Sequence, residues 1–374
     1  MWNYLARRLS VFLRYNMASI YIHIPFCERK CKYCSFVSYE KCNLLDRYIE
    51  SLLDEIRSTK RVEVDTIYIG GGTPSLLSGE QLSKILSVIR QEHNVRGDAE
   101  ISIECNPNSI TRDKLLAYKS CGVNRVSVGV QSLNDKVLDS IGRLHTGEVA
   151  LNALRLLCEI FDNVSADLIV GLPYQSKSQV IDDIKKIAPF VTHFSVYSLM
   201  LESGTKLFDE VEKGDLSLPN EDAVVDMYDS AVAVLKDLGF DRYEVSNFGQ
   251  KCEHNLAYWT QKDYYGFGVA SHSYVKGVRY CNTESLEAYL SGERILDSYT
   301  VGENESREEY IMLRMRLAEG FLIKDYFERF GVLPPMDKVE EMKKQGLVVE
   351  ARGALRATEL GFHLLNHIIL KLLD

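Results

Sequence analysis

Short runs of β-branched residues alternate with longer amphipathic stretches over the first two thirds of the chain, and this alternation most constrains the fold. The expected strands are Ile20–Ile24, Thr66–Gly70, Glu100–Cys105, Arg125–Val130, Ala166–Val170 and His193–Leu199. The expected helices are Leu44–Thr59, Gly79–Glu92, Thr111–Cys121, Gly147–Ile160, Ser178–Ala188 and Glu221–Leu238. Strands that alternate with helices are typical of a parallel sheet built from repeated βα units. The pattern predicts an α/β fold for residues 17–240, a partial (β/α)6 barrel of the TIM type.

The pattern changes beyond about residue 240, and a chain of 374 residues accommodates a second, smaller domain. Phe267–Tyr274 and Val278–Asn282 are expected to be antiparallel strands. The remaining expected elements are Ser306–Ala318, Ile323–Arg329, Met336–Gln345, Leu347–Glu350, Ala354–Ala357 and Glu359–Leu373. Helices followed by a small hairpin are typical of a winged-helix unit. Residues 241–374 are therefore expected to form a C-terminal α+β domain that contains a winged-helix-like unit.

Acidic residues outnumber basic ones by 53 to 44, which gives a net charge of −9. No global positive field would attract a nucleic acid backbone, so the winged-helix-like unit is expected to serve packing or a partner protein rather than DNA. The chain also has no run of eighteen or more apolar residues, the usual minimum for a membrane-spanning helix. The composition therefore argues against nucleic acid as a partner.

Residues 1–16 form a basic extension that contains Arg7, Arg8 and Arg14 among apolar side chains and carries no acid. One interpretation is a short amphipathic anchor or a targeting segment. The other is a start-site artefact, because Met17 opens the first expected strand. No small-residue cleavage site follows a proper apolar core, so secretion is not indicated.

Three of the nine cysteines are crowded into the pattern Cys27-x-x-x-Cys31-x-x-Cys34. At this frequency of cysteine such a triplet is expected by chance roughly 0.005 times, so it is interpreted as a ligand set. A zinc site would take His23 or Cys42 as its fourth ligand, although neither has regular zinc-finger spacing. Alternatively, three thiolates hold three irons of a four-iron, four-sulfur cluster and leave one iron open. The odd number of cysteines and the absence of a secretory signal favour a reducing compartment, the cytoplasm.

Further motifs follow the other predicted strands. Gly70–Pro74 ends the second strand, and its glycines let the backbone come close to a ligand. Glu104 ends the third strand, where a carboxylate can bind a ribose diol, and Gln131 ends the fourth. Arg143 follows a helix, and Asp167 opens the fifth strand with its Gly-Leu-Pro exit. Because parallel strands of a barrel end at one mouth, these residues are predicted to share a site.

With the segment Tyr21-Ile22-His23-Ile24-Pro25-Phe26-Cys27, these motifs resemble the radical S-adenosylmethionine (SAM) superfamily. The resemblance implies a partial barrel of the radical SAM kind, with Cys27, Cys31 and Cys34 holding a four-iron, four-sulfur cluster and SAM chelating the open iron. It also implies contacts with SAM from Tyr21, Tyr33, Gly71, Gly72, Thr73, Glu104, Gln131, Arg143 and Asp167.

Within the superfamily the chain is similar to the HemW-type haem chaperones, which are relatives of the oxygen-independent coproporphyrinogen III dehydrogenases and share a HemN-type C-terminal domain. The dehydrogenases carry a fourth cysteine two residues past the third, whereas Ser35-Phe36 follows Cys34 here, and only 26 residues precede Cys27. The HemW-type motif H-N-x-x-Y-W is present as His254-Asn255-Leu256-Ala257-Tyr258-Trp259. The resemblance implies that His254 binds haem b, and His272 and Tyr274 are further candidates for the same region.

The function implied by the resemblance is a cytoplasmic haem chaperone that passes haem to an acceptor protein. The alternative is an oxygen-independent coproporphyrinogen III dehydrogenase, which makes protoporphyrinogen IX by oxidative decarboxylation; Phe36 and the short N-terminus argue against it. A radical enzyme for an unrelated substrate is a third hypothesis, because the cluster motif does not specify the substrate. An acceptor in a respiratory membrane would bring the chain to the membrane periphery. The acceptor itself and a homodimeric state are left open, as is the cleavage of SAM.

Overall fold

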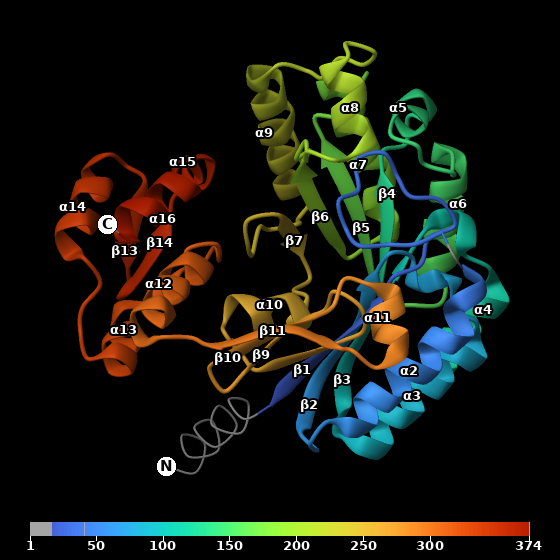
Figure 1. Cartoon of the computed structure of the whole chain (residues 1–374). Helices are drawn as coiled ribbons and strands as arrows, with labels where there is room; N and C mark the ends of the chain where they lie inside the picture. Colours follow the sequence, from blue (N-terminus) through green and yellow to red (C-terminus); the bar gives the residue numbers. More distant parts are fainter. Residues whose placement is uncertain (1–16, 41, 374) are drawn as a thin grey trace.

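The computed structural model describes residues 17–40 and 42–373, which are organised around a sheet of eleven strands (Figure 1). Six parallel strands lie side by side in chain order: β1 (Ala18–Ile24), β2 (Glu63–Gly71), β3 (Asn94–Cys105), β4 (Arg125–Gln131), β5 (Asn163–Val170) and β6 (His193–Ser198). The predicted α/β fold with six βα units is confirmed. All six strands therefore present their carboxyl ends at the same edge, where the predicted motifs lie.

Amphipathic helices cover the outer face of the parallel strands: α2 (Leu45–Ser58), α3 (Gly79–Glu92), α4 (Arg112–Ser120), α6 (Gly147–Cys158), α7 (Lys177–Ile187) and α9 (Glu221–Asp237). Helix α3 shows why they form. Ser78 and Gln81 make a reciprocal capping box at its start, and Leu82, Ile85 and Ile89 share one fully buried face. The short helix α5 (Asp135–Ser140) is the helix expected before Arg143, whereas α8 (Lys206–Glu212) was not predicted, because seven residues show too little periodicity.

Residues 241–300, which the sequence groups with the C-terminal domain, add strands to both edges of the same sheet. β7 (Asn247–Gly249) pairs antiparallel with β6, and β8 (Tyr264–Phe267) pairs parallel with β1. Beyond β8 lie β9 (His272–Val275), β10 (Val278–Asn282) and β11 (Ile295–Thr300), with helices α10 (Glu253–Trp259) and α11 (Leu286–Ser291) in the connections.

The prediction of one strand over Phe267–Tyr274 is wrong. Strand β8 ends at Phe267, and the chain turns before β9 begins at His272. Gly268 has a φ of 102° and Ala270 a φ of 57°, so both residues occupy the left-handed region, which a strand cannot use. The turn places Gly268 N–H against the buried carboxylate of Glu55 at 2.8 Å.

The C-terminal residues form a module with a hydrophobic core of its own, in which Tyr310, Phe321, Leu355 and Ile368 are buried. Its elements are α12 (Glu303–Arg314), β12 (Phe321–Leu322), α13 (Ile323–Phe330), α14 (Met336–Lys344), β13 (Val348–Ala351), β14 (Ala354–Ala357), α15 (Glu359–His363) and α16 (Leu365–Leu373). The order of helices followed by a hairpin agrees with the predicted winged-helix-like unit, although the single helix expected over Glu359–Leu373 is interrupted at Leu364. The module lies beside the sheet, away from α2 and α3 (Figure 1).

The basic extension of residues 1–16 lies outside the described residues, so both interpretations of it remain predictions. Among residues 17–40 and 42–373, no helix is long and apolar enough to cross a membrane.

Candidate functional site

The three clustered cysteines lie on the loop after β1 and line a cavity of about 620 Å³. Backbone hydrogen bonds hold this loop in place. Cys27 N–H donates to Tyr39 C=O at 3.0 Å, and Cys34 N–H donates to Cys31 C=O at 3.2 Å. The loop is also bonded to the connection before α6, because Lys32 N–H donates to Ile141 C=O at 3.0 Å.

Polar donors from the other strand ends surround the thiols. Thr73 Oγ1 lies 3.5 Å from Cys27 Sγ, and Arg143 Nη1 lies 3.5 Å from Cys31 Sγ. Arg143 is fixed in this position because its Nη2 donates to Asn106 Oδ1 at 2.9 Å and to Gly129 C=O at 2.5 Å.

The glycines after β2 let the chain approach the cysteine loop closely. A Cβ atom on Gly72 would lie 2.7 Å from Phe26 O and 3.0 Å from Cys27 Sγ. Gly71 has a φ of 119°, and a Cβ atom there would lie 2.8 Å from the His23 ring. Only glycine therefore fits at these two positions without displacing the loop.

Two half-buried carboxylates, Glu104 and Asp167, line the cavity. Glu104 accepts hydrogen bonds from Tyr68 Oη at 2.9 Å and from Gly71 N–H at 3.2 Å. Burial raises the pKa of Glu104 to about 7, with a further contribution from the negative charge of Asp167. Burial also raises the pKa of Asp167, which accepts hydrogen bonds from Ser127 Oγ at 3.0 and 3.2 Å. Both carboxylates therefore sit where a ligand that donates hydrogen bonds would be favoured.

Most of the predicted site residues lie together in this cavity. Those that line it are Cys27, Cys31, Cys34, Tyr33, Gly71, Gly72, Thr73, Glu104, Gln131, Arg143 and Asp167. Gln131 has a φ of 65°, and its buried Oε1 has no partner among the described residues. Tyr21 is not among the residues that line the cavity. Its hydroxyl lies 3.0 Å from His23 Nδ1, and its ring stacks on that of Tyr68, which does line the cavity.

His254, in α10, does not line the cavity either. Its Nδ1 lies 2.8 Å from Thr66 Oγ1, its Nε2 lies 2.8 Å from Tyr258 Oη, and its ring stacks on that of Tyr68. The residue is 1% exposed, and burial lowers its pKa to about 3, with a smaller effect of Arg125. The imidazole is therefore neutral, and both ring nitrogens are engaged.

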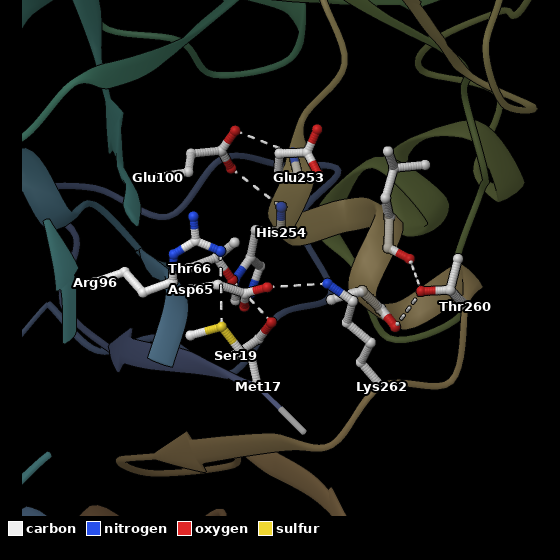
Figure 2. A network of polar contacts seen from close by, with 12 residues as sticks. Met17, Ser19, Asp65, Thr66, Arg96, Glu100, Glu253, His254, Thr260 and Lys262 are labelled. Atoms are coloured by element: carbon white, nitrogen blue, oxygen red, sulfur yellow. Dashed lines mark hydrogen bonds and ion pairs between the residues drawn. The ribbon is translucent and has the colours of Figure 1, made fainter. Parts of the chain in front are cut away.

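The backbone around His254 is equally fixed. Glu100 accepts hydrogen bonds from Glu253 N–H at 3.0 Å and from His254 N–H at 3.1 Å, and so caps the start of α10 (Figure 2). An iron bond to His254 would require that the hydrogen bond of its ring to Thr66 or to Tyr258 is broken. The other two haem candidates lie two strands away from β1, on β9, where His272 is exposed and Tyr274 is buried.

The sequence interpretation missed several cavity residues: Phe36, Tyr68, Arg125, Ser127, Ser195, Tyr197, Met200 and Asn255. A signal for some of them exists, because Arg125, Ser127 and Gly129 alternate along β4 and share its inner face. Arg125 is 1% exposed, and its Nε and Nη1 have no partner among the described residues. A polar inner face of a strand is a mark of a ligand cavity rather than of a packed barrel core.

The chain matches two family models. The model of the radical SAM superfamily matches residues 21–187, and that of the HemN C-terminal domain matches residues 303–364. The fold is similar to that of coproporphyrinogen III oxidase (HemN) from Escherichia coli, with a TM-score of 0.84 and 22% sequence identity over 97% of this chain and 93% of that one. The fold and the cysteine loop thus define a radical SAM protein with a HemN-type C-terminal domain.

Relatives that match almost the whole chain identify the family within this superfamily. The Heme chaperone HemW of Lactococcus lactis is 34% identical over 95% of this chain and 97% of its own length. The Heme chaperone HemW of Bacillus subtilis is 34% identical over 94% of this chain and 98% of its own length. The chain belongs to the HemW family. Membership of the radical SAM superfamily implies a four-iron, four-sulfur cluster and SAM as cofactors.

Proposed function

We propose that the chain is a haem chaperone, which binds haem and delivers it to acceptor proteins. The observation that carries this proposal is the 34% identity, over 95% of the chain, to a relative named Heme chaperone HemW. The place of the fourth cysteine of the dehydrogenases is taken by Phe36, which also favours the chaperone over a coproporphyrinogen III dehydrogenase.

Cys27, Cys31 and Cys34 are proposed to hold the cluster. Three thiolates that each bind a different iron need not converge on one point. In the described part of the chain, no three His, Cys, Asp or Glu side chains converge on a position for a single metal ion. Arg143 and Thr73 donate toward two of the three sulfurs, which fits anionic ligands. Bound together, the cluster and SAM supply one-electron chemistry at this site.

The residues around the cysteines fit SAM. Glu104 offers a half-buried carboxylate for a ribose diol, and the backbone at Gly71 and Gly72 is bare of side chains. The Oε1 of Gln131, which has no partner among the described residues, can accept a hydrogen bond from the ligand. Tyr33, Thr73, Arg143 and Asp167 complete the proposed contacts, with Tyr21 as support for Tyr68 from behind.

Haem b is the proposed cargo, and the prediction that His254 ligates its iron stays a prediction. Ligation would require that His254 gives up its bond to Thr66 or Tyr258 and leaves a fully buried position. The proposed acceptor is a haem protein of the cytoplasm or of the membrane surface, and the winged-helix-like module is the proposed partner-binding part. Its own core makes it a separate packing unit.

The test uses the full chain with its cluster reconstituted without oxygen. Haem is titrated in, and the absorption change gives stoichiometry and affinity. The loaded protein is then mixed with a haem-free acceptor, and transfer is followed by the acceptor's own spectrum. In parallel the protein receives SAM, a strong reductant and coproporphyrinogen III, with a known dehydrogenase as the positive control. Saturable haem binding with transfer and no protoporphyrinogen IX supports the chaperone; catalytic formation of protoporphyrinogen IX refutes it.

A further inference from the structure

Two large apolar side chains stand exposed at the lip of the cavity. Phe36 is 68% exposed and Met200 is 72% exposed, and both line the same cavity as the three cysteines. Phe36 lies on the loop after β1, and Met200 follows the end of β6 at Ser198. Large apolar side chains exposed around a polar cavity cost free energy in water and mark a place for an apolar ligand.

The loop that carries Phe36 is bonded to α8, the helix that follows the Met200 segment. Leu207 N–H in α8 donates to Lys32 C=O at 2.9 Å, and Lys32 Nζ pairs with Glu210 Oε2 at 2.8 Å. The Phe36 end of the cysteine loop is braced as well, because Lys30 Nζ donates to Phe36 C=O at 2.9 Å. The backbone that carries the exposed ring of Phe36 is therefore held by a hydrogen bond.

Positive charge lies beside the apolar lip. Arg29 and Lys30 line the cavity, and Arg29 Nη2 donates to Gly142 C=O at 2.9 Å and to Arg143 C=O at 3.1 Å. A guanidinium has five N–H donors, so these two bonds leave donors for a carboxylate. Among the cavity-lining residues of the two loops that carry Phe36 and Met200, Arg29 and Lys30 are basic and Glu202 is acidic. The lip thus favours an apolar ligand that carries carboxylates.

A ligand for iron is present at the same lip. The thioether of methionine is an axial ligand of haem iron in other haem proteins, and Met200 presents its side chain to solvent. His254, by contrast, is buried, and both of its ring nitrogens are hydrogen-bonded. Met200 can therefore meet an iron without any rearrangement of the described hydrogen bonds.

We propose that haem binds at this lip, with its ring against Phe36, its iron ligated by the Met200 thioether, and its propionates facing Arg29 and Lys30. The inference rests on the proposed function and specifies its site. Haem then lies over the mouth of the cavity that holds the cluster and SAM, so the binding of haem and of SAM is coupled, and each changes the affinity for the other by the same factor.

The experiment titrates haem into the cluster-loaded full chain and into the variants Met200→Ala, Phe36→Ala and Met200→His. Leu296→Ala is the matched control, because Leu296 is 63% exposed on β11, at the far edge of the sheet. Met200→Ala is expected to lose the sulfur-to-iron absorption band and about tenfold in affinity, and Phe36→Ala to lose about tenfold with the band retained. Met200→His is expected to restore affinity with the spectrum of an imidazole-bound haem.

The outcomes separate the two proposals. A wild-type chain that binds no haem refutes the proposed function and this site with it. A wild-type chain that binds haem, with Met200→Ala showing an unchanged spectrum, overturns the assignment of Met200 while the chaperone function stands. The same holds if Phe36→Ala binds as tightly as Leu296→Ala. Iron and sulfide content and SAM affinity, measured for every variant, show that the cluster site has stayed intact.

Discussion

The contact between Gly72 and the cysteine loop makes the sharpest prediction. In Gly72→Ala the new methyl group would lie 2.7 Å from Phe26 O, a backbone atom, and 3.0 Å from Cys27 Sγ. An ordinary contact of this kind is about 3.4 Å, so the loop must move by roughly 0.7 Å, and overpacking of this size costs about 1–3 kcal/mol. For a chain of 374 residues the melting temperature should fall by about 1–4 °C.

The displaced atom carries a proposed cluster ligand, so the loss should extend to the cluster. We expect Gly72→Ala to hold less iron and sulfide per chain after reconstitution and to release the cluster faster on exposure to air. Gly97→Ala is the control, because a Cβ atom at Gly97 would meet nothing within 4 Å. If Gly72→Ala kept the melting temperature, the iron content and the spin-resonance spectrum of the wild type, the close approach would have no role in holding the site.

Three further predictions follow from single contacts. Glu104→Gln should weaken SAM binding at pH 8 yet raise the melting temperature. The pKa of Glu104 is about 7 in the folded protein and about 4.5 in the unfolded one, so its carboxylate destabilises the fold increasingly as the pH rises through that window. Thermal scans should therefore show a much larger gain in melting temperature at pH 8 than at pH 5, and an equal gain at both would contradict the reasoning. Thr66→Val should cost about 1–3 kcal/mol in urea unfolding, because it leaves the buried Nδ1 of His254 without a partner, whereas Thr66→Ser should cost less than half as much. Arg143→Lys should retain the charge but not the geometry that joins Cys31, Asn106 and Gly129, so the reconstituted cluster should decay faster than in the wild type; an equal decay rate would mean that charge alone suffices.

The parallel strands could be predicted because their signal is local. Runs such as Ile20–Ile24 are short, β-branched and bounded by polar residues, and the structure places them as β1 to β6. The strand-end residues could be predicted to share a site because one edge of a parallel sheet collects them. The break at Gly268 to Ala270 could not, since alanine in the left-handed region carries no signature in the sequence.

The hydrogen bonds of the His254 ring could not be predicted from the sequence either. The motif that contains it suggests an available imidazole, but its partner Thr66 lies 188 positions away in the chain, on the strand against which α10 packs. The lip residue Met200 carried no motif at all, and only the fold brings it to the cavity of the cysteines. Contacts of this range depend on the packing of elements and not on local pattern.

The six parallel strands do not close on themselves, since β1 pairs with β8 and β6 pairs with β7. The bonds of Lys32 to Leu207 and Glu210, the latter 178 positions away, instead join the two sides of the opening. The loop that carries the cysteines thus also connects the two sides of the open barrel. A change in the cysteine loop would therefore reach α8, and through α8 the segment before it that bears Met200, on the opposite side of the opening.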